Sequence, residues 1–226
     1  MSSVGRNSAS ARPAPRIVMI TGSSAGAGKS TLARSLADTL RENGAEADLV
    51  AEEAIFKREE FTEVASGFRT RDWPRADQFL RAYALLFDSW RRTGSWAVFD
   101  WSCLDMIEDL PWAQGMQPLV RMARSVRVLA SGLSPLLIGL DVDLTVAAKR
   151  VLTRDSEWIQ AWMGTGLDLP LAKPSVSEVI RRMETGGARN AVLFDAFRLT
   201  GWPVSRLDAN QNADAVLMAA RRVLGL

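Results

Sequence analysis

The feature that most constrains this chain is a glycine-rich turn placed between a short apolar run and an amphipathic helix. Residues 16–21 form the apolar run, and Leu32, Leu36 and Leu40 then recur at helical spacing. A strand, a glycine-rich loop and a helix in immediate succession cradle phosphate with backbone N–H groups and the positive end of the helix. The sequence therefore predicts an α/β protein that binds a nucleoside triphosphate.

The loop departs in one place from the common pattern G-x-x-x-x-G-K-[ST]. Its first glycine position holds Ser23, and Gly22 stands one residue earlier. Lys29 is placed to reach the β- and γ-phosphates, and the hydroxyl of Ser30 to ligate Mg²⁺. The predicted phosphate-binding residues are Gly22, Ser23, Ser24, Ala25, Gly26, Ala27, Gly28, Lys29, Ser30 and Thr31.

Strand and helix patterns alternate along the rest of the chain, which indicates parallel strands joined by helices. We therefore expect a three-layer α/β/α sandwich with a five-stranded, mainly parallel sheet. Further strands are predicted at 47–51, 96–100, 135–141 and 204–207, and helices at 54–64, 77–92, 117–130, 145–153, 175–197 and 213–224.

The chain is expected to form a single domain over residues 16–226. Residues 1–15 are rich in Ser, Ala, Arg and Pro and predict a disordered leader, with a targeting peptide of similar composition as the alternative. An irregular, glycine- and proline-bearing segment at about 153–174 is placed to act as a lid. No run of eighteen apolar residues occurs, so no membrane span is expected.

The composition excludes several kinds of chemistry. The chain has no histidine and one cysteine, Cys103, which removes histidine bases, Ser-His-Asp triads, disulfides and zinc clusters. Proton transfer must therefore rest on carboxylates, water, Lys29 or the single tyrosine, Tyr83. The lack of disulfides fits a cytoplasmic setting, and a formal net charge of +2 without a basic block gives no reason to expect a nucleic-acid partner.

An acidic residue closes the third predicted strand. Asp100 follows the run from Trp96 to Phe99, where a carboxylate at the carboxyl edge of the sheet would lie near Mg²⁺. Asp141 and Asp143 follow the fourth strand and are the rival placement. We expect Ser30 and Asp100 to hold the metal.

The residues after the fourth strand favour phosphoryl transfer. Arg150 and Arg154 lie on the next helix and at the start of the expected lid, where they could stabilise charge on the transferred group. The alternative is a solvated helix face, since the two arginines are four residues apart. Trp101 rather than Glu follows Asp100, which argues against ATPases that carry a catalytic Glu at that position.

These segments resemble the thymidylate kinase and deoxynucleoside kinase group of P-loop kinases. The matching pieces are residues 20–33, residues 50–56, the predicted helix at 77–92 that leads into 98–102, and residues 140–155. The resemblance implies that Glu53, or its neighbour Glu52, deprotonates the acceptor hydroxyl. The third-strand motif departs from the group, because Trp101 replaces the arginine that would contact the acceptor.

The region between the second and third strands is expected to grip the acceptor with arginines and aromatic rings. Phe79 and Tyr83, at helical spacing, also suit a core, and Trp101 suits either a stacked ligand or the core. The predicted acceptor-binding residues are Glu52, Phe56, Arg69, Trp73, Phe79 and Trp101.

The sequence thus predicts an ATP- and Mg²⁺-dependent phosphotransferase in which Lys29, Glu53, Asp100, Arg150 and Arg154 are catalytic. Its partner would be a small-molecule acceptor, such as a nucleoside, a nucleotide or a natural product, with no nucleic acid and no membrane. The sequence also allows a homodimer. The alternatives are a nucleotide-dependent regulatory ATPase that binds a protein partner and a transferase that binds another phosphate-bearing cosubstrate.

Overall fold

The structure is a computed structural model that describes the chain except for residues 1–16, 23, 71–74, 106–115, 155 and 164–173. At its centre lies a five-stranded sheet in the order β2-β3-β1-β4-β5, and every adjacent pair is parallel. The strands are β1 (Ile17–Gly22), β2 (Ala47–Val50), β3 (Trp96–Phe99), β4 (Pro135–Asp141) and β5 (Val204–Asp208). The predicted five-stranded α/β sheet is confirmed.

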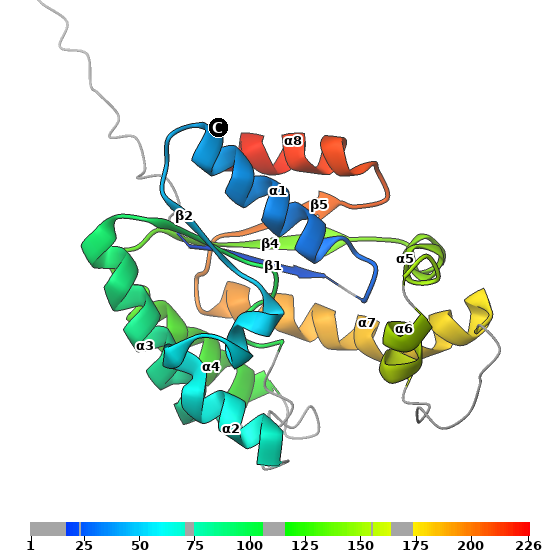
Figure 1. The fold of residues 1–226 in the computed structure, drawn as a ribbon, viewed down its shortest axis with the longest axis horizontal. Coiled ribbons are helices and arrows are strands. Elements are labelled where there is room, and N and C mark those ends of the chain that lie inside the picture. Colours follow the sequence, from blue (N-terminus) through cyan, green and yellow to red (C-terminus); the bar gives the residue numbers. More distant parts are fainter. Residues whose placement is uncertain (1–16, 23, 71–74, 106–115, 155, 164–173) are drawn as a thin grey trace, which may run out of the picture.

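Two helices cover one face of the sheet, α1 (Lys29–Glu42) and α8 (Ala213–Leu224) (Figure 1). They pack on alternate residues of the central strand, Val18 and Ile20, which are completely buried. This alternation follows from the strand period of two.

Three helices cover the opposite face, α3 (Ala76–Thr93), α4 (Met116–Leu129) and α7 (Val176–Leu199). The intervening residues of β1, Ile17 and Met19, point to this side. Burial on both faces explains why the strands are nearly continuous apolar runs rather than alternating ones.

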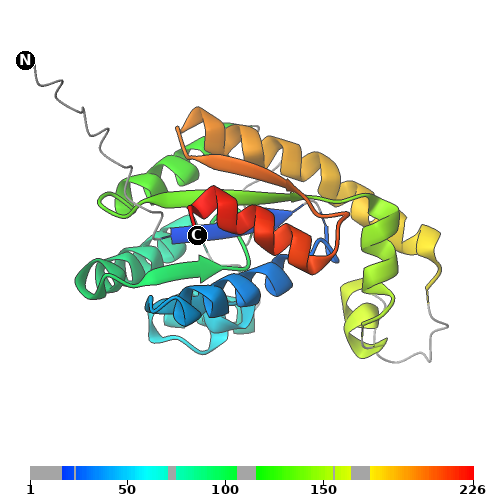
Figure 2. The same cartoon turned by 90° about the horizontal axis from the view of Figure 1, so that it is seen from above.

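A third cluster lies beyond the carboxyl ends of the strands, where α5 (Leu144–Val151) and α6 (Ser156–Met163) meet the first part of α7 (Figure 2). The irregular segment expected after 153 therefore contains a helix, since Ile159 packs into this cluster. The helix predicted at 175–197 corresponds to α7, which is continuous across Gly186 and Gly187.

The connection from β2 to α3 differs most from the prediction of one helix at 54–64. The structure has two 3₁₀ turns, η1 (Glu52–Phe56) and η2 (Glu59–Phe61), and then α2 (Thr62–Thr70). The break falls at Arg58, whose backbone is extended with φ −96° and ψ 139°. Its side chain is held by carboxylates, as described below, so the helical run is divided there.

The strand order places the crevice of the sheet at the end of β1. From β1 the chain passes to β2, returns to β3 and then crosses β1 to reach β4. In open α/β sheets, ligands bind outside the carboxyl ends of the strands where the order reverses in this way. Among the described residues, no helix is long and apolar enough to cross a membrane.

Candidate phosphoryl-transfer site

The glycine-rich loop follows β1 and leads into α1 at the end of the sheet where the strand order reverses. Gly26 and Gly28 have φ angles of 78° and 95°, which side chains of L-residues rarely adopt. A Cβ on Gly26 would lie 2.4 Å from the carbonyl oxygen of Ala147, so this glycine allows the loop to touch α5. A Cβ on Gly22 would lie 2.9 Å from the Cβ of Ala27, which explains a glycine at the early position.

The side chains of the loop leave polar groups for a ligand. Nζ of Lys29 donates to the carbonyl oxygen of Ser24 at 3.3 Å, across the loop. The Oγ atom of Ser24 is buried, and no atom of the described residues forms a hydrogen bond with it. No acidic residue stands in the first turn of α1, so the positive end of the helix is open to an anion. Ser23 lies outside the described residues.

Asp100 and Ser30 come together as predicted. Asp100 is only 7% exposed at the end of β3, and its side chain shares a hydrogen bond with Ser30. Burial raises the pKa of Asp100, while the Ser30 bond and a backbone bond from Glu52 oppose that rise. The Oδ1 atom of Asp100 is buried and has no hydrogen-bond partner within the part of the chain that the structure describes.

This pair fits Mg²⁺, which is usually held by one or two protein oxygens together with waters and substrate phosphates. The unpartnered Oδ1 of Asp100 and the hydroxyl of Ser30 are oxygen ligands of the required kind. Of the two rival carboxylates, Asp141 instead forms an ion pair with Arg206, with Nε to Oδ2 at 2.9 Å, and Asp143 precedes the first residue of α5. The geometry therefore favours Asp100 over Asp141.

Two glutamates stand next to this pair, on η1. Burial raises the pKa of Glu52, and the charge of Asp100 raises it further, while Lys29 lowers it. The carboxyl group of Glu52 is therefore close enough to interact electrostatically with both Lys29 and Asp100. Glu53 acts on both Glu52 and Asp100 through its charge.

Asp105 also lies near these carboxylates, although no sequence pattern marks it. Its Oδ1 accepts from the Thr21 hydroxyl at 3.1 Å, and its Oδ2 accepts from the Ser102 N–H at 2.8 Å. Its charge also raises the pKa of Glu52. The sequence held little signal for it, because Asp105 lies in a segment with no periodicity after the strand.

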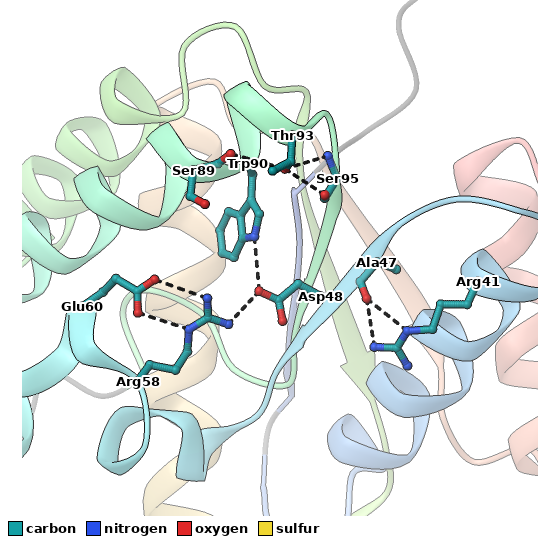
Figure 3. A network of polar contacts seen from close by, with 9 residues as sticks. All are labelled: Arg41, Ala47, Asp48, Arg58, Glu60, Ser89, Trp90, Thr93 and Ser95. Carbon is teal, nitrogen blue, oxygen red and sulfur yellow. Dashed lines mark hydrogen bonds and ion pairs between the residues drawn. The ribbon is translucent and has the colours of Figure 1, made fainter.

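A polar network fixes the segment that carries the glutamates (Figure 3). NH1 of Arg58 donates to Asp48 at 2.6 Å, and Asp48 also accepts from Nε1 of Trp90 at 3.2 Å. The same guanidinium donates to both carboxylate oxygens of Glu60, at 3.3 and 3.4 Å. Because Asp48 lies on β2 and Arg58 follows η1, this network closes the loop that presents Glu52.

A small cavity of about 160 Å³ adjoins the glycine-rich loop. Arg150 borders it and donates to the carbonyl oxygens of Ala209 and Gln211, at 2.9 and 3.1 Å. Its guanidinium thus joins α5 to the segment after β5, a contact that the sequence did not indicate. The lining residues are Ala27, Gly28, Thr31, Leu32, Ser35, Leu140, Arg150, Ala209, Gln211, Ala213 and Val216.

The second predicted lid arginine, Arg154, is exposed, and its Cζ lies 4.3 Å from the ring centroid of Trp158. This stacking joins the turn between α5 and α6 to α6 itself. The predicted charge-stabilising role of Arg150 and Arg154 stays a prediction.

The predicted acceptor residues separate into core and surface. Phe79 is fully buried and Trp101 is 2% exposed, which favours the core role that the sequence also allowed for both residues. The ring centroids of Trp101 and Phe99 are 5.5 Å apart, and Trp101 belongs to the aromatic core between β3 and α3. Phe56 is 49% exposed and Arg69 is also exposed, whereas Trp73 lies outside the described residues.

Tyr83, which the sequence left as a candidate for proton transfer, is also in the core, as is the single cysteine, Cys103. Tyr83 and Cys103 are fully buried, and burial raises the pKa of each well above its usual value. Neither side chain can exchange a proton with a ligand from there. The carboxylates at the sheet edge, water and Lys29 are left as candidates for proton transfer.

Two solved structures with a similar fold are both kinases. An APS kinase from Mycobacterium tuberculosis, solved with AMPPNP and APS, has 17% sequence identity and a TM-score of 0.53, covering 95% of this chain and 100% of its own. A deoxyadenosine kinase from M. mycoides with bound dATP has 16% identity and a TM-score of 0.50, covering 93% and 100%. No protein-family model matches the sequence, and no curated protein matches it.

At these identities the likeness establishes the fold. The chain has the fold of P-loop nucleotide kinases, and the resemblance drawn from the sequence is confirmed at that level.

Proposed function

We propose that this protein is an ATP-dependent phosphotransferase that moves the γ-phosphoryl group of ATP to a hydroxyl of a small molecule. The observation that carries the proposal is the juxtaposition of Ser30, Asp100 and Glu52 with the glycine-rich loop and Lys29. A phosphate cradle alone would support binding, whereas an adjacent carboxylate of raised pKa supports transfer.

The donor would lie along α1. The loop N–H groups and Lys29 would bind the β- and γ-phosphates, and the base would extend toward the cavity bordered by Arg150 and Ala209. Ser30 and Asp100 would hold Mg²⁺, which would neutralise negative charge on the phosphate groups during transfer.

Glu52 is our choice for the general base, in place of Glu53, which the resemblance favoured. Burial and the charge of Asp100 raise the pKa of Glu52, and the charge of Lys29 lowers it, so its carboxyl is coupled to the reacting centre. A base with a pKa nearer neutrality accepts a proton more effectively during transfer.

Transfer of the phosphoryl group would proceed as a displacement at the γ-phosphorus. The acceptor O–H gives its proton to Glu52 while its oxygen forms the new bond to the γ-phosphorus. The bond from that phosphorus to the β,γ-bridging oxygen breaks, and ADP leaves with the electron pair. Lys29 stabilises the negative charge on the phosphate oxygens throughout.

A nucleoside is one acceptor class to test, and natural products with free hydroxyls are another. The experiment incubates the full chain with ATP, Mg²⁺ and a panel of such compounds, and measures ADP together with the mass of phosphorylated product. Acceptor-dependent ADP that disappears in Lys29→Ala supports transfer. Slow ATP hydrolysis that no small molecule changes, but that a protein stimulates, would favour the regulatory ATPase instead.

A further inference from the structure

A second, larger recess lies at the opposite edge of the sheet, where β4 and β5 begin. It is a groove of about 1190 Å³ between the last turns of α4 and α8 and the start of the two strands. Figure 1 places these strand starts at the end of the sheet away from α5 and α6. The lining residues are Arg124, Arg127, Val128, Ala130, Ser131, Leu133, Ser134, Pro135, Leu136, Thr200, Pro203, Ser205, Arg222, Val223, Leu224 and Gly225.

The charged residues that line this groove are all basic. Arg124, Arg127 and Arg222 line it, and none of its lining residues is acidic. Within the part of the chain that the structure describes, none of the three forms an ion pair with a carboxylate. Arg127 donates one bond to the carbonyl oxygen of Thr200. The groove therefore offers guanidinium donors to an anion.

Apolar side chains are exposed at the same place. Val128 is 67% exposed and Val223 is 38% exposed, and both line the groove. Leu199, 65% exposed, immediately precedes the lining residue Thr200. Exposed apolar side chains that gather in one patch mark interaction sites, and arginine is enriched at protein interfaces while acidic residues are depleted.

We propose that this arginine groove docks an acidic segment of a partner protein that also carries apolar anchor residues. The apolar walls would hold the anchors, and the three guanidinium groups would pair with carboxylates, bidentately where the geometry allows. The surface is independent of the phosphoryl-transfer site, because the two lie at opposite ends of the strands.

The positive charge of the groove argues against two other occupants, a second copy of this chain and the chain's own N-terminal residues. A second copy docked through the same surface in a two-fold contact would set arginines against arginines. The chain's own residues 1–16 contain three arginines and no acidic residue, so they too carry the wrong sign.

The test is a selection from a random twelve-residue peptide display library on the full chain, followed by measured affinities of the enriched peptides. The expected result is peptides rich in Asp or Glu with spaced apolar residues. Arg124→Glu/Arg222→Glu should weaken their binding by about tenfold or more, and added salt should weaken it too. Arg121→Glu, an exposed position on the same helix outside the groove, is the matched control and should change little.

Several results would overturn the proposal. These are enrichment of basic or neutral peptides, enriched peptides that bind the double variant as well as the wild type, and no enrichment. A change of oligomeric state in the double variant, measured by light scattering, would identify the groove as a contact between copies. Duplex DNA binding that the double variant loses would assign the arginines to nucleic acid. ATP binding, measured in parallel, should be unchanged and shows that the variant is folded.

Discussion

Replacing Gly26 by alanine tests how the glycine-rich loop is held against α5. The loop needs φ 78° at this residue, which costs a residue with a side chain about 1–2 kcal/mol. Alanine also restricts the unfolded chain, which stabilises the folded state by about 0.4–1 kcal/mol. The net backbone cost is therefore about 1 kcal/mol of folding free energy. The new Cβ would also lie 2.4 Å from the carbonyl oxygen of Ala147, a backbone atom that cannot turn away.

Overpacking of this kind typically costs about 1–3 kcal/mol, so Gly26→Ala should lower the free energy of unfolding by about 2–4 kcal/mol. For a chain of this length, that corresponds to a melting temperature lower by roughly 4–16 °C. Because the loop must move away from α5 to relieve the contact, nucleotide affinity should fall by about tenfold or more. Thermal unfolding and titration with a fluorescent ATP analogue measure the two effects.

Gly44→Ala is the matched control. Gly44 has φ 80°, but a Cβ there meets no atom within 4 Å. It should show only the backbone cost, about 1 kcal/mol, with nucleotide affinity unchanged. Equal losses of stability and affinity in the two variants would refute the role assigned to the contact between Gly26 and Ala147.

Three further variants address the carboxylates and the network around them. In the native state Glu52 has a pKa raised above 4.5, so stability falls as the pH rises from that value through the native pKa. Glu52→Gln should therefore raise the melting temperature at about pH 8 and leave it unchanged at about pH 4; calorimetry that shows the same gain at both would contradict this. Asp100→Asn should lower turnover by about 10–100-fold at saturating acceptor and raise the Mg²⁺ requirement, and an unchanged Mg²⁺ titration would remove it from the metal site. Arg58→Met should lower kcat more than ATP affinity. It should also lower the free energy of unfolding by about 1–3 kcal/mol, since Asp48 and Glu60 lose their shared partner. The control Arg92→Met removes an exposed ion pair and should lower it by less than about 0.5 kcal/mol. An equal effect of the two arginine variants on kcat would contradict the positioning role of Arg58.

The sheet and the phosphate loop were predictable because their signals are local. Each buried strand is an apolar run, and Gly28-Lys29-Ser30 follows one directly. Parallel strands end at one edge, so Asp100 could be placed next to Ser30 without knowledge of the strand order.

The acceptor side was less predictable because core and ligand contacts share the same residue types. Phe79 and Trp101 are aromatic residues close in sequence to the site, yet both complete the packing between α3 and β3. Only the tertiary contacts distinguish this from stacking on a ligand.

The segment after β2 was mispredicted for a related reason. Its helical pattern is interrupted where Arg58 meets Asp48, a residue ten positions earlier on the edge strand. Asp105 was missed because its partners, Thr21 and Ser102, come together only when β1 and β3 pair. Contacts of this kind leave no periodic trace in the sequence.

The most direct test of the proposed phosphotransferase activity is the mass of the product formed from ATP, Mg²⁺ and a panel of hydroxyl-bearing acceptors. We expect one acceptor to gain a single phosphoryl group with an equal amount of ADP released. That product should be lost in Lys29→Ala and strongly reduced in Glu52→Gln, while both variants keep the wild-type circular dichroism spectrum. Product formation that Lys29→Ala leaves intact, or tight ATP binding with no acceptor phosphorylated across the panel, would contradict the proposed function.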